Sequence, residues 1–375
     1  MSMKVTRDVV YVTHDSLSEG IGMSQIVPLL IGYAGKGLKV GVISCEKVDA
    51  PLELRETLSQ NGIYWKPIKF GRYGPLGGFG RVIRLALFLP KAKVFHCRGD
   101  ISATATSIRS KKPFIWDVRG LWLDQKIILS GLERRVIVIR IAKLLEKRAA
   151  SKAKAVTTLT SAVYPVLRRR HPTLTANHTV IPTCVDLTKF SFSPILPQKR
   201  NLLLSGVFND YYDLEKTKKF TTLLKRDSDI HITWCHGKEA MRESLGVGED
   251  EIKTLTQPEM PREIANSSFG LAICKENSGE SLLGVMPTKV AEFLATGRPV
   301  VVSAGIGDLD SMLIEYGAGV ILSASLEHDI KLLEKLLLDP QTSYRCRELA
   351  EFYFSMDLAV DNYYRILSDL VIDFN

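Results

Sequence analysis

Residues 8–25 read DVVYVTHDSLSEGIGMSQ, a β-branched run followed at once by a glycine-containing loop that opens a helix-period segment. β-Branched residues favour strands, and glycine lets the backbone turn tightly from a strand into a helix. The same alternation continues to about residue 182, which is typical of a parallel sheet. The strands expected in this half are residues 8–13, 39–44, 63–68, 93–97, 113–118, 155–159 and 179–182.

The alternation restarts after residues 191–200, which contain two prolines, lack periodicity and precede a change in the sign of the charge. Apolar residues at helical spacing in 356–372 predict a last helix that returns to the first domain. We therefore predict an α/β fold of two Rossmann-like, doubly wound domains facing a cleft. Their expected bounds are 1–195 and 196–355, with the returning helix in 356–375. The second domain should hold strands at residues 201–206, 229–234, 269–274 and 299–303.

Basic side chains are concentrated in the first domain. The chain of 375 residues has 50 Lys and Arg against 41 Asp and Glu, and residues 1–196 hold 31 basic and 13 acidic side chains. Such asymmetry indicates contact with a polyanion, either nucleic acid or an anionic membrane surface, or serves solubility alone. The sequence contains no RNA-recognition, KH or zinc-finger motif, so we predict no nucleic-acid partner and keep a basic nucleic-acid-binding protein as an alternative.

Cysteine usage indicates a reducing compartment. The six cysteines lie far apart without a C-x-x-C pair, and neither they nor the seven histidines have metal-ligand spacing. We predict no metal and no covalently bound cofactor. Charged residues interrupt the N-terminal segment before a signal core forms, and no apolar run approaches the roughly 18 residues of a membrane span. A cytoplasmic protein is expected.

Two loops of the first domain contain candidate binding residues. Gly22 lies in the first loop and lets the backbone approach a ligand, although Gln25 stands where a dinucleotide fingerprint needs its third glycine. Asp117 and Arg119 end the fifth strand on the same face, a pattern that suits a sugar hydroxyl and a phosphate. The alternatives are an ordinary strand-to-helix turn for the first loop and a structural ion pair for the second.

The strongest candidate is the polar loop at residues 278–286, which runs into a helix. Pro287 suits the start of that helix, and Thr288 and Lys289 fall in the first turn, whose free N–H groups favour an anion. Glu292 shares the face of Lys289 one turn deeper and can accept hydrogen bonds from ribose hydroxyls. This pattern predicts a diphosphate site. An amphipathic helix with an i, i+3 charge pair is the alternative.

Two further loops follow strands of the second domain. Ser205 and Gly206 precede aromatic and acidic residues that suit a base or sugar platform, or a helix start capped by Asp213. His236 and Gly237 end the next strand and could border the base, although a histidine there is more often a bystander.

With these loops placed, nearly the whole chain resembles the retaining GT-B glycosyltransferases that use nucleotide sugars, in particular family-four-like bacterial enzymes of surface-polysaccharide synthesis. The resemblance implies transfer of a hexosyl or N-acetylhexosaminyl group from a UDP- or GDP-sugar to a glycan acceptor, without an obligatory enzyme nucleophile. Gly284 stands where many relatives have the first of two glutamates, and Glu280 or backbone N–H groups of the Ser278 loop are the expected substitutes. The residues that carry the resemblance are Ser24 and Gln25, residues 117–120, residues 180–186, and residues 287–300 with Pro287, Thr288, Lys289 and Glu292.

The expected roles follow from this resemblance together with the loop positions. Catalytic roles are expected for Asp117, Arg119 and Lys289. Donor-binding roles are expected for Gly22, Ser205, Gly206, His236, Gly237, Glu280, Pro287, Thr288 and Glu292. Acceptor-binding roles are expected for Glu19, Ser24, Gln25 and Asp124. A nucleotide-sugar epimerase of the same architecture is an alternative, although no cluster of acid and base side chains for it is identified.

A basic amphipathic segment indicates that the acceptor is bound at a membrane surface. Residues 126–154 hold nine basic side chains against two acidic ones, with apolar residues interspersed. Such a segment is typical of attachment to an anionic membrane surface, and a solvated helix face is the alternative. We expect a lipid-linked glycan acceptor and a peripheral position at the inner membrane face.

Overall fold

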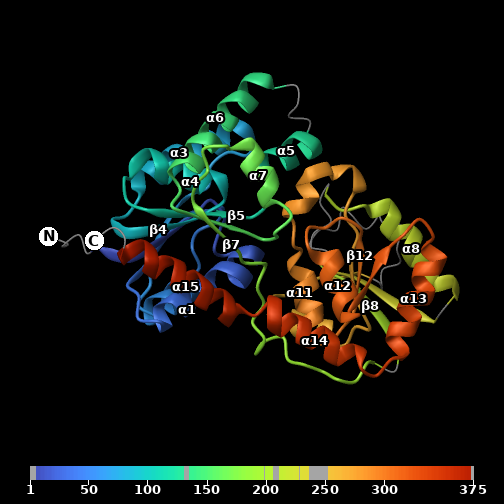
Figure 1. Ribbon diagram of the computed structural model, residues 1–375. Helices are drawn as coiled ribbons and strands as arrows, with labels where there is room; N and C mark the ends of the chain where they lie inside the picture. Colours follow the sequence, from blue (N-terminus) through green and yellow to red (C-terminus); the bar gives the residue numbers. More distant parts are fainter. Residues whose placement is uncertain are drawn as a thin grey trace. The chain divides into compact units, whose positions relative to one another are not determined.

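The computed structural model forms two compact units (Figure 1). Unit 1 comprises residues 1–182 and 356–375, and unit 2 comprises residues 183–355. The predicted fold class, with two wound α/β domains, is confirmed. The structure describes residues 6–130, 135–197, 199–205, 211–227, 229–235 and 252–372.

Unit 1 is built on a parallel sheet of seven strands in the order β3-β2-β1-β4-β5-β6-β7. Every strand predicted for this half is present, with ends that differ by a few residues at most. Strand β2 is buried along its whole length and so is β5, because helices cover both faces of the sheet. The strands are β1 (Arg7–Thr13), β2 (Val40–Glu46), β3 (Tyr64–Lys69), β4 (Ala92–Arg98), β5 (Phe114–Val118), β6 (Ala155–Thr158) and β7 (Asn177–Val180).

Helices lie on both faces of this sheet. Figure 1 shows α1 and α15 on one face and α3, α4 and α6 on the other. The predicted last helix is present as α15, and its apolar residues Ala359, Tyr363 and Leu367 are buried. The helices of unit 1 are η1 (Gly22–Ile26), α1 (Val27–Gly35), α2 (Leu52–Gln60), α3 (Gly74–Phe88), α4 (Gly99–Arg109), α5 (Trp122–Ser130), α6 (Val136–Lys152), α7 (Tyr164–Arg170) and α15 (Met356–Ile372).

Unit 2 repeats the winding with shorter strands. Two three-stranded parallel sheets, β10-β9-β8 and β11-β12-β13, are joined by a parallel bridge between Leu202 and Phe269. All four predicted strands are present. β10, which has only two residues, and β13 were not predicted. The strands are β8 (Arg200–Leu204), β9 (Ile230–Cys235), β10 (Ile252–Lys253), β11 (Gly270–Ala272), β12 (Val300–Ser303) and β13 (Gly319–Leu322).

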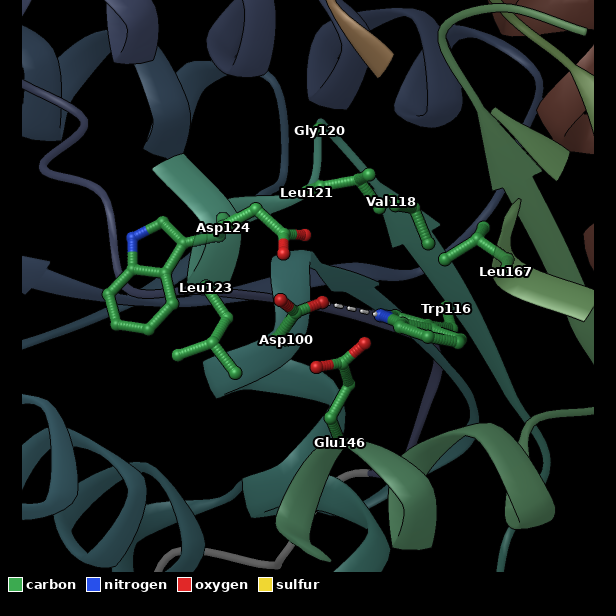
Figure 2. A pocket seen from close by; sticks show the side chains of 10 residues that line it. Asp100, Trp116, Val118, Gly120, Leu121, Leu123, Asp124, Glu146 and Leu167 are labelled. Carbon is green, nitrogen blue, oxygen red and sulfur yellow. Dashed lines mark hydrogen bonds between the residues drawn. The ribbon is translucent and has the colours of Figure 1, made fainter. Parts of the chain in front are cut away.

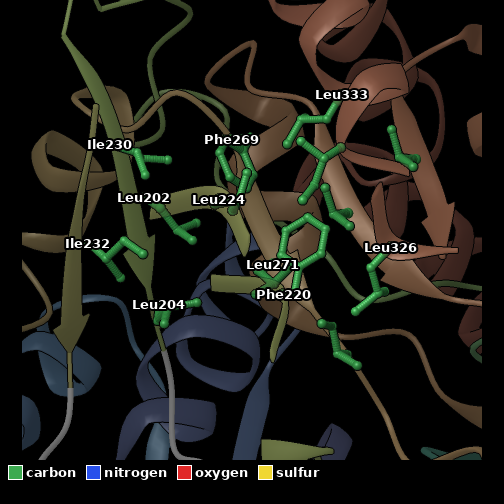
Figure 3. Packing of buried hydrophobic residues seen from close by; sticks show 14 of the residues in the cluster. Leu202, Leu204, Phe220, Leu224, Ile230, Ile232, Phe269, Leu271, Leu326 and Leu333 are labelled. Atoms are coloured by element: carbon green, nitrogen blue, oxygen red, sulfur yellow. The ribbon is translucent and has the colours of Figure 1, made fainter. Parts of the chain in front are cut away.

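The core of unit 2 lies between this sheet and the helices α8 and α13. Figure 3 shows Leu202 and Leu204 of β8 packed with Phe220 and Leu224 of α8 and with Leu333 of α13. The helices of unit 2 are α8 (Leu214–Asp227), α10 (Met260–Ala265), η4 (Glu276–Gly284), α11 (Thr288–Ala295), α12 (Leu309–Tyr316), α13 (Leu326–Leu338) and α14 (Thr342–Tyr353).

The predicted boundary segment, residues 191–200, packs on unit 2. The buried guanidinium of Arg298 donates hydrogen bonds to the carbonyl oxygens of Ser193 (2.9 Å) and Ile195 (3.1 Å). The ring of Phe192 lies so close to Gly297, whose φ is +81°, that a Cβ there would meet it at 2.9 Å. The guanidinium group has five N–H donors and can satisfy several carbonyls at once, which explains why the segment is held despite its two prolines.

The strand orders locate the candidate binding edges. In unit 1 the order reverses between β1 and β4, and in unit 2 it reverses between β8 and β11. Ligands of wound sheets bind at such reversals, outside the edge where the strands end, which we call the carboxyl edge. Within the described ranges, no helix combines the length and the apolarity needed to cross a membrane.

Candidate functional site

The candidate site in unit 2 is formed by the segments that follow β8 and β11. Ser205 follows β8, and the η4 segment follows β11 and leads into α11. These segments meet at the reversal of strand order, so the elements themselves place the predicted donor residues at the carboxyl edge. Three predicted residues, Gly206, His236 and Gly237, lie outside the residues that the structure describes.

Helix α11 begins as the sequence predicts. Pro287 precedes it with extended backbone (φ −65°, ψ 126°), and Thr288 is its first residue. The first N–H groups of any α-helix lack partners within the helix, and together with the helix dipole they favour an anion. The Thr288 hydroxyl lies 3.2 Å from that of Thr183, which fixes the start of the helix to the chain entering unit 2.

Lys289 is a buried cation in the first turn of α11. Its side chain extends over the ring of Tyr212, with Nζ 4.2 Å from the ring centre. Burial lowers the pKa of Lys289 to about 8, although the neighbouring Cys274 and Glu292 act in the opposite direction. A bound anion stabilises the charged form of a buried ammonium, so this side chain can serve a diphosphate.

Tyr212 reaches Lys289 because of a short antiparallel pairing beside the sheet. The N–H of Asp213 donates to the carbonyl of Ile273 (2.9 Å), and the N–H of Lys275 donates to the carbonyl of Tyr211 (3.0 Å). The aromatic pair was predicted as a base or sugar platform. The structure gives Tyr212 a different contact, beneath the ammonium of Lys289.

Glu292 lies one turn further along α11. Burial raises the pKa of this carboxyl to about 7, while the charge of Lys289 lowers it. A carboxyl with a pKa near neutrality can accept a hydrogen bond or donate one, so it can pair with a hydroxyl that donates or with one that accepts.

Two buried serine hydroxyls of these segments have no hydrogen-bond partner among the described residues. They belong to Ser205, at the end of β8, and to Ser278, in η4. Buried hydroxyls are normally paired, and an unpaired one costs about 1–3 kcal/mol. Next to Ser278, Gly279 has φ +56°, a conformation that favours glycine. Glu280 is exposed.

In unit 1 the loop after β1 is organised by Glu46, a residue that the sequence reading missed. This buried carboxylate accepts hydrogen bonds from the hydroxyls of Ser16 (2.5 Å) and Ser44 (2.6 Å) and from the N–H of Leu17 (2.9 Å). Gly22 packs on the same loop: a Cβ there would lie 2.3 Å from the carbonyl oxygen of Ser16. The structure therefore gives this glycine a packing reason.

The predicted acceptor residues of this loop differ in exposure. Glu19 is exposed and pairs with Lys47 at 2.6 Å, whereas Gln25 is buried and Ser24 is half-buried. The reversal between β1 and β4 is spanned by an ion pair from Asp15 to Arg98 Nε, at 2.9 Å. Burial alone would raise the pKa of Asp15, but the charges of His14 and Arg98 lower it.

Asp117 and Arg119 are brought together, with Arg119 Nη1 3.6 Å from Asp117 Oδ1. The carboxylate, however, lies in the interior, where it accepts hydrogen bonds from Thr157 (3.0 Å) and Tyr363 (3.1 Å). Burial opposes its ionisation, yet Arg119 and His96 hold the pKa of Asp117 well below its usual range. Protein hydroxyls thus occupy the positions at Asp117 where sugar hydroxyls were expected. Of the two residues, Arg119 is the more exposed, with 14% of its side chain accessible.

His96 links this carboxylate to a third buried hydroxyl. Its Nε2 lies 3.4 Å from Asp117 Oδ2, and its Nδ1 lies 2.9 Å from the hydroxyl of Tyr33. Burial lowers the pKa of His96, so the ring is neutral at pH 7. The tautomer with the proton on Nε2 fits both neighbours, because Tyr33 can then donate to Nδ1.

Asp124 lines a shallow hollow near the end of β5. Figure 2 shows the carboxylates of Asp100, Asp124 and Glu146 directed toward this space and Trp116 donating to Asp100 at 3.1 Å. Burial and the charge of Glu146 raise the pKa of Asp100 to about 8. Asp124 is paired with Arg170. Within the described part of the chain, no group of three His, Cys, Asp or Glu could hold a metal ion.

Sequence reasoning missed Glu46, Arg98, His96 and Tyr363 as partners of the predicted residues. Each one is polar within or next to a buried apolar segment, and this is the signal that could have found them. Their partners could not have been assigned, because each contact joins positions far apart in the sequence.

No protein-family model and no curated protein matches the sequence. Solved structures do match. Sucrose-phosphate synthase from Thermosynechococcus elongatus is 13% identical with a TM-score of 0.73, covering 98% of this chain and 100% of that chain. HepE from Anabaena, solved with UDP and glucose, is 14% identical with a TM-score of 0.65, covering 97% and 100%. The lipopolysaccharide outer core galactosyltransferase WaaB is 13% identical with a TM-score of 0.64, covering 96% and 99%. The chain therefore has the two-domain, Rossmann-like GT-B fold of these glycosyltransferases.

Proposed function

We propose that the protein is a retaining glycosyltransferase that moves a hexosyl or N-acetylhexosaminyl group from a UDP- or GDP-sugar to a glycan acceptor. The observation that carries the proposal is the buried Lys289 in the first turn of α11, at the reversal of strand order in unit 2. HepE, which shares the fold, has been solved with UDP and with UDP-glucose. These findings support a nucleotide sugar as the donor.

On this proposal the donor diphosphate binds at the start of α11. The backbone N–H groups of Thr288 and Lys289 and the Lys289 ammonium meet its negative oxygens. Glu292 accepts or donates a hydrogen bond at a ribose hydroxyl. The unpaired hydroxyls of Ser205 and Ser278 provide further donors, and a ligand would satisfy them.

The reaction needs little covalent chemistry from the protein. The acceptor hydroxyl forms a bond to the anomeric carbon while the bond from that carbon to the diphosphate oxygen breaks, and the hydroxyl proton passes to the departing phosphate. Negative charge grows on the leaving group, so fixed donors aimed at it lower the barrier. Removing one such donor typically costs about 2.7–4 kcal/mol.

We assign the acceptor to unit 1. Arg119 offers a partly exposed guanidinium for an anionic group of a substrate, and Asp117 acts as its positioning residue. Glu19, Ser24, Gln25 and Asp124 remain the proposed acceptor contacts. A lipid-linked acceptor fits the basic segment at 126–154, where α6 exposes Ile137 and Leu144 beside its cations. Because a lipid-linked acceptor is held in the membrane, the enzyme would attach peripherally to the inner membrane face.

A thermal-shift panel of nucleotide sugars tests the donor. One nucleotide series, uridine or guanosine, should raise the melting temperature, because a ligand at 100 times its Kd stabilises by about 2.7 kcal/mol. The matching nucleoside without phosphates serves as the control and should have little effect. Absence of a shift with every nucleoside diphosphate would contradict the proposal.

Product analysis then tests the reaction. The stabilising donor, incubated with candidate glycan acceptors, should give a glycoside whose anomeric configuration by NMR equals that of the donor. Inverted configuration would contradict retention. An epimerised donor without any glycoside would instead favour the epimerase alternative.

A further inference from the structure

Helix α3 exposes an apolar stripe to solvent. Leu76, Ile83 and Leu87 are 77%, 58% and 68% exposed. Their spacing of seven and four residues places them on one side of the helix, opposite the buried Val82 and Leu85. Surface helices normally carry polar residues on the side away from the core, so this stripe calls for a partner.

The chain around this stripe is basic and contains no acid. Residues 57–99 include no Asp or Glu and eight basic side chains. Lys66 Nζ lies 5.1 Å from the ring centre of Phe88, which is itself 46% exposed at the end of α3. Arg81 and Arg98 are buried, and Lys93 pairs with Asp8. The exposed or half-buried cations of this segment are Lys66, Lys69, Arg72, Arg84, Lys91 and Lys93.

Helix α3 belongs to the same layer as the basic helix α6. Both pack against α4, and Figure 1 shows the three helices on one face of the sheet. Arg148 of α6 donates a hydrogen bond to the carbonyl of Ser107 in α4, at 3.2 Å. The outer side of α6 repeats the pattern of α3, with Ile137 74% and Leu144 66% exposed. The cations Arg140, Lys143 and Lys147 accompany them.

We infer that the α3 stripe is a second membrane-docking element, which inserts Leu76, Ile83 and Leu87 into an anionic bilayer alongside α6. This inference deepens the membrane part of the proposed function. An anionic bilayer supplies both acyl chains for the stripe and phosphates for the surrounding cations. A second copy of the chain would bring cation against cation in a two-fold contact, and charge therefore disfavours it.

Flotation with lipid vesicles tests the inference. Vesicles of phosphatidylcholine alone are compared with vesicles containing about one third phosphatidylglycerol. The variant Leu76→Ser, Ile83→Ser, Leu87→Ser removes the stripe, and Ile314→Ser, Leu338→Ser, Phe352→Ser removes similarly exposed apolar residues of unit 2 as a matched control. We expect the α3 variant to lose on the order of tenfold in partition coefficient on anionic vesicles, since each buried methylene contributes to insertion. The control should float like the wild type.

Three results would overturn the inference. They are equal flotation of the α3 variant and the wild type, no flotation of the wild type on anionic vesicles, and a wild-type dimer in gel filtration that the α3 variant dissociates. Circular dichroism melts show whether each variant is folded. Nucleotide-sugar binding in solution is measured in parallel and involves no lipid, so loss of the donor function and loss of membrane docking are distinguished.

Discussion

At the scale of single residues, Lys289 is central to the proposed diphosphate site. Its ammonium is buried against an aromatic ring, and burial brings its pKa down to about 8. A lysine with a lowered pKa costs the folded state stability below that pKa, and the cost disappears as the pH rises toward the ordinary value near 10.4. A bound diphosphate offsets the same cost by pairing with the ammonium. The protonated Lys289 is therefore more stable with a bound anion than without one.

The first prediction concerns Lys289→Met. Hydrogen bonds to charged groups contribute about 1.5–3 kcal/mol, so we expect nucleoside-diphosphate affinity at pH 7 to fall roughly ten- to hundredfold. Wild-type affinity should decrease between about pH 7 and pH 9 as Lys289 loses its proton, whereas the variant should be nearly flat. Calorimetric titration measures both, with Lys335→Met, an exposed lysine of the same unit, as the control. Parallel pH profiles for wild type and variant would exclude this role.

At the scale of elements, α15 is attached to the sheet of unit 1 through a buried polar contact. Tyr363 of this helix donates to Asp117 at 3.1 Å, and its ring lies 4.5 Å from that of His96. Asp117 in turn faces Arg119 at 3.6 Å. The last helix of the chain thus reaches the candidate site through one carboxylate.

The second prediction concerns Tyr363→Phe, which removes one donor to a buried carboxylate and keeps the ring. We expect a loss of about 1.5–3 kcal/mol in the free energy of unfolding of unit 1, measured by denaturant titration. Turnover should fall because Asp117, the partner of Arg119, loses one of the donors that fix its position, while donor affinity, assigned to unit 2, stays unchanged. Tyr344→Phe, an exposed tyrosine of α14, is the control. Unchanged stability and turnover would show that the contact has no positioning role.

At the scale of the whole molecule, the alternation of strands and helices could be predicted from the sequence, because both units are built from parallel strands with strong apolar character. The start of α11 was also readable, since Pro287 and the polar loop before it are local signals. Strand β10 was not predicted because its two residues show no period. Strand β13 was also missed, although it is as long as the predicted β12. The network of Asp117, His96 and Tyr363 was not predicted, because its contacts join residues that are far apart in the sequence.

The same reasoning explains why the fold is recognisable at 13% identity. Strand order, helix starts and buried apolar patterns define a wound sheet, and many different side chains satisfy them. Donor and acceptor identity depend on a few edge residues. Functional claims therefore have to be tested at those residues.

The most direct test of the central claim, that a nucleoside diphosphate binds at the start of α11, is hydrogen–deuterium exchange mass spectrometry with and without the stabilising nucleotide. Binding slows exchange where amides are engaged or local opening is suppressed. We predict slower exchange in peptides covering residues 276–292, and no such effect in Lys289→Met at the same nucleotide concentration. Nucleotide binding that leaves residues 276–292 unchanged and protects only peptides of unit 1 would contradict the account.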